Sequence, residues 1–220
     1  MANLASKALS EFTGTAILVG VVVGSGIMGT NLSEDAGVAL LINTVSTIFA
    51  LALLILSLGP ISGAHFNPAV SLVELFSKNL STSQTLVYLV SQTSGAIFGA
   101  ITANFMFDLA PIQISTHERI TSGTLIGEVI ATAGLVALIS ILVSRKQGTL
   151  IPVAVAAWIG SAYFFTSSTS FANPAVTVGR IFSDTFAGIA PVSVLPFIAA
   201  QLIGAAIGLV IARGVARAGN

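Results

Sequence analysis

The sequence predicts an all-α membrane protein with six transmembrane helices and two re-entrant half-helices, related by an inverted internal repeat. Hydrophobic residues make up 55% of the 220 residues and charged residues only 7%, a composition typical of membrane proteins and not of soluble domains. The apolar residues form six long stretches, and the tripeptide Asn-Pro-Ala occurs once in each half of the chain. These three observations predict the fold class.

Each of the six apolar stretches is interpreted as a membrane-spanning helix. Most approach the roughly 20 residues that a helix needs to cross the hydrocarbon core, although the fifth is short. Because they use nearly the whole chain, we expect a single domain, 1–220, and no separate soluble domain. The stretches cover residues 12–28, 38–58, 86–106, 125–143, 150–165 and 192–212.

The charged residues predict the orientation and exclude some function classes. Only Arg119 and Arg180 lie on one side of the predicted topology, so the positive-inside rule predicts that the other side, with both termini, is cytoplasmic. The chain has no cysteine and zero net charge, so we expect no disulfide, no thiol chemistry and no nucleic-acid partner. The cations on the cytoplasmic side are Lys7, Lys78, Arg145, Lys146, Arg213 and Arg217.

Three features recur in the same order in both halves, about 1–110 and 120–220. Glu11 and Glu128 lie early in the first and fourth stretches, and the two Asn-Pro-Ala motifs are 106 residues apart. The pattern Gln-x-x-Gly-Ala-x-x-Gly begins at Gln92 and again 109 residues later at Gln201, and it is interpreted as a mark of close helix packing. Since each half has an odd number of spans, the second half enters the bilayer from the opposite side, which places the working site near the midplane.

Each Asn-Pro-Ala motif predicts the start of a half-helix, because Asn is favoured as N-cap and Pro as first helical residue. Segments 68–77 and 174–183 would each span about 15 Å, half the hydrocarbon thickness, so two of them entering from opposite faces would meet at the centre. The non-helical segments 59–64 and 166–171 that lead to them must face protein or water. The expected pore-centre residues are Asn67, Pro68, Ala69, Asn173, Pro174 and Ala175.

Two helix N-termini at one pore centre predict a passive pore for uncharged solutes. Each N-terminus carries about half a positive charge, so the pair opposes cations and protons. The side-chain amides of Asn67 and Asn173 donate hydrogen bonds to a passing water molecule. Such a pore requires no catalysis, no cofactor, no metal and no energy source.

The paired motifs, the stretch Ile-Ser-Gly-Ala-His-Phe-Asn-Pro-Ala-Val at 61–70 and the pattern Glu-Phe-x-Gly-Thr at 11–15 resemble the aquaporin or major intrinsic protein family over essentially the whole chain. The resemblance implies a homotetramer in the lipid bilayer, with one pore per subunit, and facilitated diffusion of water or small neutral solutes. It also implies that Glu11 and Glu128 brace the loops before the half-helices and that His65 belongs to the pore wall.

The chain departs from the family pattern at the outer constriction. Most relatives have an Arg directly after the second Asn-Pro-Ala, whereas this chain has Val176. Counting along the family pattern assigns Thr47, Ser161 and Ser170 to the other constriction positions, so we expect a wide, uncharged ring lined by hydroxyl groups. The stretch 167–176 is similar to a bacterial subgroup linked to arsenic handling. We therefore expect passage of glycerol-like polyols and neutral metalloid hydroxides as well as water.

Arg180 leaves an alternative open. It lies four residues after Val176, one helical turn further outward, and can replace the missing Arg to give a water-selective channel. The other interpretation of Arg180 is a solvated side chain, or one that pairs with Asp184.

Two other function classes are weaker alternatives. Inverted repeats also build secondary transporters, but these need ion-coordinating carboxylates at the midplane, and neither motif has one beside it. An intramembrane serine protease would have to use Ser62 and His65, which lie three residues apart on one loop instead of on separate helices. We therefore expect a channel in a bacterial inner membrane, and not an enzyme.

Overall fold

The structure is a computed structural model that describes residues 2–218, with side chains up to residue 216. Within these residues it is all helical, and six helices are long and apolar enough to cross a membrane. They are α1 (Leu4–Leu32), α2 (Ala36–Ser62), α4 (Thr82–Met106), α5 (Ser122–Ser144), α6 (Ile151–Phe165, preceded by a 3₁₀ turn at Gly148–Leu150) and α8 (Pro191–Ala218). The short helices α3 (Pro68–Phe76) and α7 (Pro174–Gly179) complete the set, which confirms the predicted fold class.

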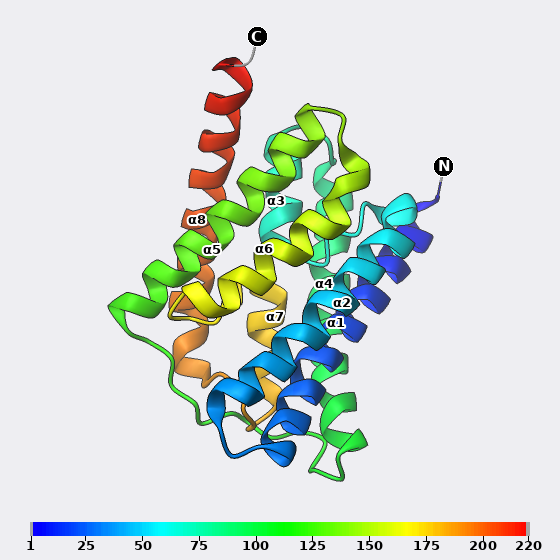
Figure 1. The fold of residues 1–220 in the computed structure, drawn as a ribbon. Coiled ribbons are helices and arrows are strands. Elements are labelled where there is room, and N and C mark those ends of the chain that lie inside the picture. Colours follow the sequence, from blue (N-terminus) through cyan, green and yellow to red (C-terminus); the bar gives the residue numbers. More distant parts are fainter. Residues whose placement is uncertain (1, 219–220) are drawn as a thin grey trace.

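The two short helices lie inside the ring of long helices. In Figure 1, α3 lies in the upper part of the molecule and α7 in the lower part, and both are surrounded by the six long helices. The start of α1 and the end of α8 lie at the same end of the molecule (Figure 1), as an even number of spans requires. The side chain of Arg217, one of the cations expected on the cytoplasmic side, lies outside the described residues.

Glycines hold the helices of each half in close contact. α1 packs against α4, and its counterpart α5 packs against α8. A Cβ atom on Gly95 would collide with the carbonyl oxygen of Phe12, and one on Gly204 would collide with that of Val129. α2 packs against α6 and joins the two halves on one side, while both half-helices pack against α4 and α8 on the other.

The second helix runs further than the sequence suggested. Residues 59–62 were expected to be non-helical, but α2 continues through Pro60 to Ser62. Pro60 lies in the last turn of the helix, so its missing N–H removes a single hydrogen bond from the ladder. The helix ends at Gly63, whose φ of 91° is the left-handed conformation that favours glycine at this position.

The second half-helix is shorter than expected. Its α-helical part ends at Gly179 and is followed by a 3₁₀ turn at Arg180–Phe182. The carbonyls of this turn are used by other segments: Ile181 accepts from the N–H of Ser115 at 2.8 Å, and Phe182 accepts from Asn104 Nδ2 at 2.8 Å. In a longer α-helix these two carbonyls would accept from the N–H groups of residues 185 and 186; because they have partners outside the helix instead, the chain does not go on as an α-helix beyond this turn.

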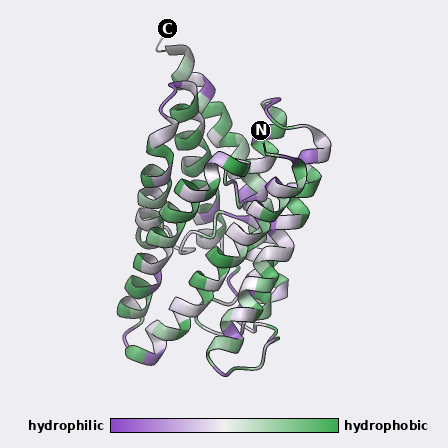
Figure 2. Cartoon of the chain, turned by 90° about the vertical axis from the view of Figure 1, so that its right-hand side faces the viewer, coloured by the Kyte–Doolittle hydropathy of each residue, from purple (hydrophilic) through white to green (hydrophobic). Residues whose placement is uncertain are grey.

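The outer face of the molecule is apolar along the length of the helices. Figure 2 shows hydrophobic residues along the long helices and hydrophilic residues gathered toward their ends. Large apolar side chains such as Phe105 and Leu195 are more than 70% exposed. A surface of this kind fits hydrocarbon and not water, so the chain is a multi-pass membrane protein.

Candidate functional site

The two Asn-Pro-Ala motifs meet in the interior and hold each other by reciprocal hydrogen bonds. Asn67 Nδ2 donates to the carbonyl of Ala172 at 2.7 Å, and Asn173 Nδ2 donates to the carbonyl of Phe66 at 2.7 Å. Each Asn Oδ1 accepts from the backbone N–H two residues on, at 2.9 Å for Ala69 and 3.0 Å for Ala175. Since a side-chain amide carries two N–H groups, each Asn keeps one donor for a molecule in the cavity.

The loops before the half-helices have the same unusual backbone in both halves. Ala64 and Phe66 adopt positive φ angles of 49°, and their counterparts Ser170 and Ala172 adopt 51° and 47°. Residues with a Cβ rarely adopt this left-handed conformation, and it persists only where surrounding contacts impose it. The two loops are therefore held in shape by other parts of the molecule.

Two buried carboxylates impose this shape. Glu11 accepts from the N–H groups of His65 at 3.0 Å and Phe66 at 2.7 Å. Glu128 accepts in the same way from Phe171 and Ala172, both at 2.8 Å. Each carboxylate is completely buried. Inside a membrane no water is available to accept hydrogen bonds from the backbone N–H groups of a loop, and the carboxylate supplies the acceptors instead.

Two glutamines, Gln92 and Gln201, hold the two carboxylates in place. This role differs from the interpretation of these glutamines as marks of close helix packing alone. Gln92 Nε2 donates to Glu11 at 2.7 Å and to the hydroxyl of Ser71 at 2.9 Å. Gln201 Nε2 donates to Glu128 at 2.6 Å and to Thr177 at 2.9 Å. The glycines of the repeated pattern pack the helices, whereas the glutamines orient the carboxylates.

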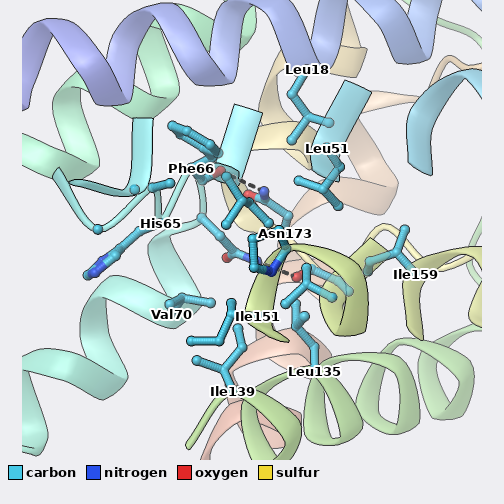
Figure 3. A pocket seen from close by; sticks show the side chains of 18 of the residues that line it. Leu18, Leu51, His65, Phe66, Val70, Leu135, Ile139, Ile151, Ile159 and Asn173 are labelled. Atoms are coloured by element: carbon cyan, nitrogen blue, oxygen red, sulfur yellow. Dashed lines mark hydrogen bonds between the residues drawn. The ribbon is translucent and has the colours of Figure 1, made fainter. Parts of the chain in front are cut away.

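A cavity of about 580 Å³ passes the two asparagines and is lined by residues of both halves. Figure 3 shows Asn173 surrounded by apolar side chains from several helices, with the two asparagine hydrogen bonds drawn as dashed lines. Such walls offer few hydrogen bonds, so a polar solute finds its partners at the asparagines and at the polar residues of the two ends. The labelled apolar residues are Leu18, Leu51, Phe66, Val70, Leu135, Ile139, Ile151 and Ile159.

Three of the four expected constriction residues, Thr47, Ser170 and Val176, line this cavity. Ser161 does not; it is exposed on the outside of α6, and the expectation for this residue is wrong. The α6 residues that line the cavity lie mainly at every fourth position, namely Ile151, Val155, Ile159 and Tyr163. Ser161 lies about 200° around the helix from Ile159, so it faces away from the cavity.

Tyr163 occupies the position that Ser161 was expected to fill. It is buried, lines the cavity, and its hydroxyl lies 3.4 Å from Thr47 Oγ1. The sequence carried little signal for this face, because nearly every residue of 151–165 is apolar and the apolar pattern therefore does not mark which side of the helix lines the cavity. An aromatic side chain here makes the ring narrower than one lined by serine.

Arg180 is buried at the same end of the cavity. Only 4% of its surface is exposed, and it lines the cavity together with Val176. Its Nε donates to the carbonyl of Ala187, and its guanidinium lies 3.4 Å from the centre of the Phe171 ring. The interpretation of Arg180 as a solvated side chain is therefore wrong.

Asp184 does not pair with Arg180 as one interpretation required. Its carboxylate accepts from the N–H and the hydroxyl of Thr116, at 2.8 and 3.1 Å, and lies 3.9 Å from His117. The hydrogen bond from the Thr116 N–H is the main reason that the pKa of Asp184 is lower than usual, and the weaker charge interaction with His117 acts in the same direction. Asp184 thus anchors the loop between α4 and α5.

Ser62 and His65, the pair that a serine protease would have to use, have separate hydrogen-bond partners in the structure. His65 lines the cavity, and its Nδ1 lies 3.0 Å from Ser71 Oγ. Ser62 instead donates to Glu11 at 2.6 Å. Among the described residues there is also no group of three His, Cys, Asp or Glu side chains that could hold a metal ion.

Comparisons with known proteins agree with this geometry. The family model described as major intrinsic protein matches residues 1–172, a range that ends one residue before Asn173. The chain is 43% identical over 211 residues to aquaglyceroporin AqpS of Rhizobium meliloti (strain 1021), covering 96% of this chain and 90% of that protein. It is 27% identical to aquaporin NIP3-1 of Arabidopsis thaliana, covering 80% of this chain and 58% of that protein. The X-ray structure of the aquaglyceroporin from Plasmodium falciparum has a TM-score of 0.74 at 18% identity, covering 98% of this chain and 96% of that one.

Proposed function

The chain belongs to the major intrinsic protein family and is a passive channel for water and glycerol-like solutes, and we propose that Arg180 is the filter arginine of its outer constriction. The observation that carries this proposal is the burial of Arg180 against the same cavity that passes Asn67 and Asn173. In this proposal Arg180, which lies four residues after Val176, takes over the role of the missing Arg.

The proposed filter consists of Thr47, Tyr163, Ser170, Val176 and Arg180. Within the described residues, the Arg180 side chain makes a single hydrogen bond, from Nε to Ala187, which leaves its terminal N–H groups for the oxygens of a solute. The hydroxyls of Thr47 and Tyr163 can accept or donate, while Val176 offers an apolar surface to C–H groups. A polyol, with hydroxyls on one side and carbon on the other, fits such a two-sided ring.

The same chemistry extends to neutral metalloid hydroxides, which are small, uncharged and rich in hydroxyl groups. The positive charge of Arg180 and the two half-helix N-termini would reject cations and protons at two successive points. Ionised forms of the same solutes should therefore pass far more slowly than the neutral forms.

Purified channel in liposomes tests the proposal, with water, glycerol, urea and a larger polyol supplied in turn. The unmodified protein should admit water and glycerol and exclude Na⁺ and H⁺. Arg180→Ala should raise urea and larger-polyol permeability relative to water and admit cations, because the ring becomes wider and loses its charge. Arg145→Ala, an exposed cation at the other end of the molecule, is the control and should change nothing. An Arg180→Ala channel with an unchanged solute profile and unchanged ion exclusion would remove Arg180 from the filter.

We further propose a homotetramer with one pore per subunit, in a bacterial inner membrane with both termini in the cytoplasm. The family supports the assembly, and the predominance of Lys and Arg at one end supports the orientation. Chemical cross-linking in native membranes checks the assembly, and a ladder that stops at the dimer would contradict it.

A further inference from the structure

The loop between α4 and α5 carries a second arginine to the outer end of the cavity. Arg119 is held there by three contacts: its backbone N–H donates to Ser193 Oγ at 2.9 Å, its Nε donates to the carbonyl of Gly188 at 2.7 Å, and its Nη2 donates to that of Phe186 at 2.9 Å. The main chain and the guanidinium are thus both fixed.

Arg119 and Arg180 share one short segment of backbone. Arg119 binds the carbonyls of Phe186 and Gly188, and Arg180 binds the carbonyl of Ala187, the residue between them. Three consecutive carbonyls therefore alternate between the two arginines. A shift of this segment caused by one arginine must move the hydrogen-bond acceptor of the other.

The two arginines also share one aromatic ring. The Cζ of Arg180 lies 3.4 Å from the centre of the Phe171 ring, and that of Arg119 lies 5.3 Å from it. Phe171 is itself fixed, because its N–H donates to Glu128 and its ring packs edge-on against Phe197 at 5.3 Å. Cations are attracted to the face of an aromatic ring, so Phe171 links the positions of both guanidinium groups.

In the part of the chain that the structure describes, no carboxylate forms an ion pair with either arginine. Among the residues that the structure describes, the ion pair of His117 with Asp184 is the only one. Glu128, the nearby buried carboxylate, already accepts hydrogen bonds from Phe171, Ala172 and Gln201. The outer end of the cavity therefore holds two positive charges, and backbone carbonyls and an aromatic ring are what stabilise them.

We propose that Arg119 is a positioning residue of the outer filter: through the 186–188 backbone and the Phe171 ring it fixes the Arg180 guanidinium, and it adds a second positive charge to the cation barrier. This inference rests on the proposed role of Arg180. It makes the loop between the two halves of the chain a part of the selectivity device and not only a connection.

The test compares Arg119→Gln, Arg119→Lys and Arg180→Ala, alone and as Arg119→Gln/Arg180→Ala, in liposomes. The quantity measured is the ratio of glycerol to water permeability, together with Na⁺ and H⁺ leak. Arg119→Gln should shift the ratio in the same direction as Arg180→Ala, by about three- to tenfold, the range that loss of one cation–π contact with its hydrogen bonds allows. In the Arg180→Ala background it should cause no further shift of the ratio, since the group that it positions is gone.

Arg119→Lys and one further variant, Phe171→Leu, separate positioning from charge and from mere loop stability. Arg119→Lys keeps the charge but not the two-carbonyl geometry, so it should shift the ratio and leave cation exclusion close to that of the unmodified channel. Phe171→Leu removes the shared ring while both charges remain, and it should shift the ratio as Arg119→Gln does. Phe171→Leu also keeps the test possible if the Arg119→Gln protein does not reach the membrane.

The outcomes distinguish this inference from the function on which it rests. If Arg180→Ala shifts the ratio whereas Arg119→Gln and Phe171→Leu do not, Arg119 is only a loop anchor and the inference is wrong. If the effects of Arg119→Gln and Arg180→Ala multiply in the double variant, Arg119 does not act through Arg180. If Arg180→Ala itself changes neither the permeability ratio nor the ion leak, the proposed role of Arg180 in the filter is wrong, and the inference about Arg119 loses its basis.

Discussion

At the scale of single residues, the residues beside the two Asn-Pro-Ala motifs have the most strained backbone conformations. Ala64, Phe66, Ser170 and Ala172 all have positive φ angles without being glycine, which stores strain in both loops. Each loop is held by one carboxylate, which accepts hydrogen bonds from two backbone N–H groups. The strain and the brace therefore recur together in both halves, and removing the brace should release the loop.

Glu128→Gln tests this at one of the two loops. The substitution keeps the volume but leaves one acceptor oxygen for two backbone N–H donors, and it turns an amide donor toward one of them. We expect it to lower the free energy of unfolding by about 2–4 kcal/mol, the cost of leaving a buried donor unpaired beside a lost charged hydrogen bond. The measurement is thermal or denaturant unfolding in detergent.

The control for this change is Glu118→Gln, an exposed carboxylate in the preceding loop, which should leave the stability within about 0.5 kcal/mol of the unmodified value. Equal stability of the Glu128→Gln and Glu118→Gln proteins would show that the carboxylate does not hold the loop.

At the scale of helices, small residues decide which pairs pack closely. α5 and α8 meet at Gly204 and Gly208, as α1 and α4 meet at Gly95 and Gly99. A Cβ atom at Gly208 would collide with the carbonyl of Ala133 and lie 3.0 Å from Val136 Cβ. Because neither helix can move away without disturbing the half-helix beside it, these contacts tolerate no added side chain.

Gly208→Val should therefore separate α5 from α8 and destabilise the protein by about 3 kcal/mol or more, seen as loss of the monodisperse peak after solubilisation. Gly214→Val in the same helix is the matched control, since an added Cβ there meets no atom within 4 Å. Equal yield and dispersity of the two variants would contradict the close-packing argument.

At the scale of the whole molecule, the inverted repeat brings one half-helix in from each end, and their Asn caps meet in the interior. The two ends of the molecule differ in charge, since most Lys and Arg lie at the end that holds the start of α1 and the end of α8. By the positive-inside rule, that asymmetry supports the proposed orientation, with both termini in the cytoplasm.

Single cysteines can verify the orientation cleanly, because the natural chain has none. Gln147→Cys lies in the exposed loop between α5 and α6, and Glu118→Cys lies in the exposed loop between α4 and α5. A membrane-impermeant maleimide should label Glu118→Cys in intact cells and Gln147→Cys only after permeabilisation. The reverse pattern would place the termini outside and overturn the orientation.

The sequence by itself determined the fold class, the six spans and the two half-helix starts at Asn67 and Asn173. These follow from signals that act locally: apolar length, N-cap chemistry and a pattern repeated in both halves. Thr47 and Ser170 could also be placed, by counting along the pattern of the family that the sequence resembles, and Val176 because it directly follows the second motif. The roles of Gln92 and Gln201 were missed. A glutamine three residues before a glycine is typical of close helix packing, and its hydrogen bond to a carboxylate is seen only in the tertiary structure.

Only the tertiary structure decided the outer end of the cavity. Ser161 was assigned by counting from Asn173 across a non-helical loop, and such a count does not fix which face of α6 points inward; Tyr163 does. The path of Arg180 depends on carbonyls and N–H groups of segments 113–115 and 186–188, and Arg119 approaches it from the loop between α4 and α5, which also contains segment 113–115. Local sequence fixes where a helix starts, but the direction of a side chain beyond its end depends on distant backbone that no local pattern encodes.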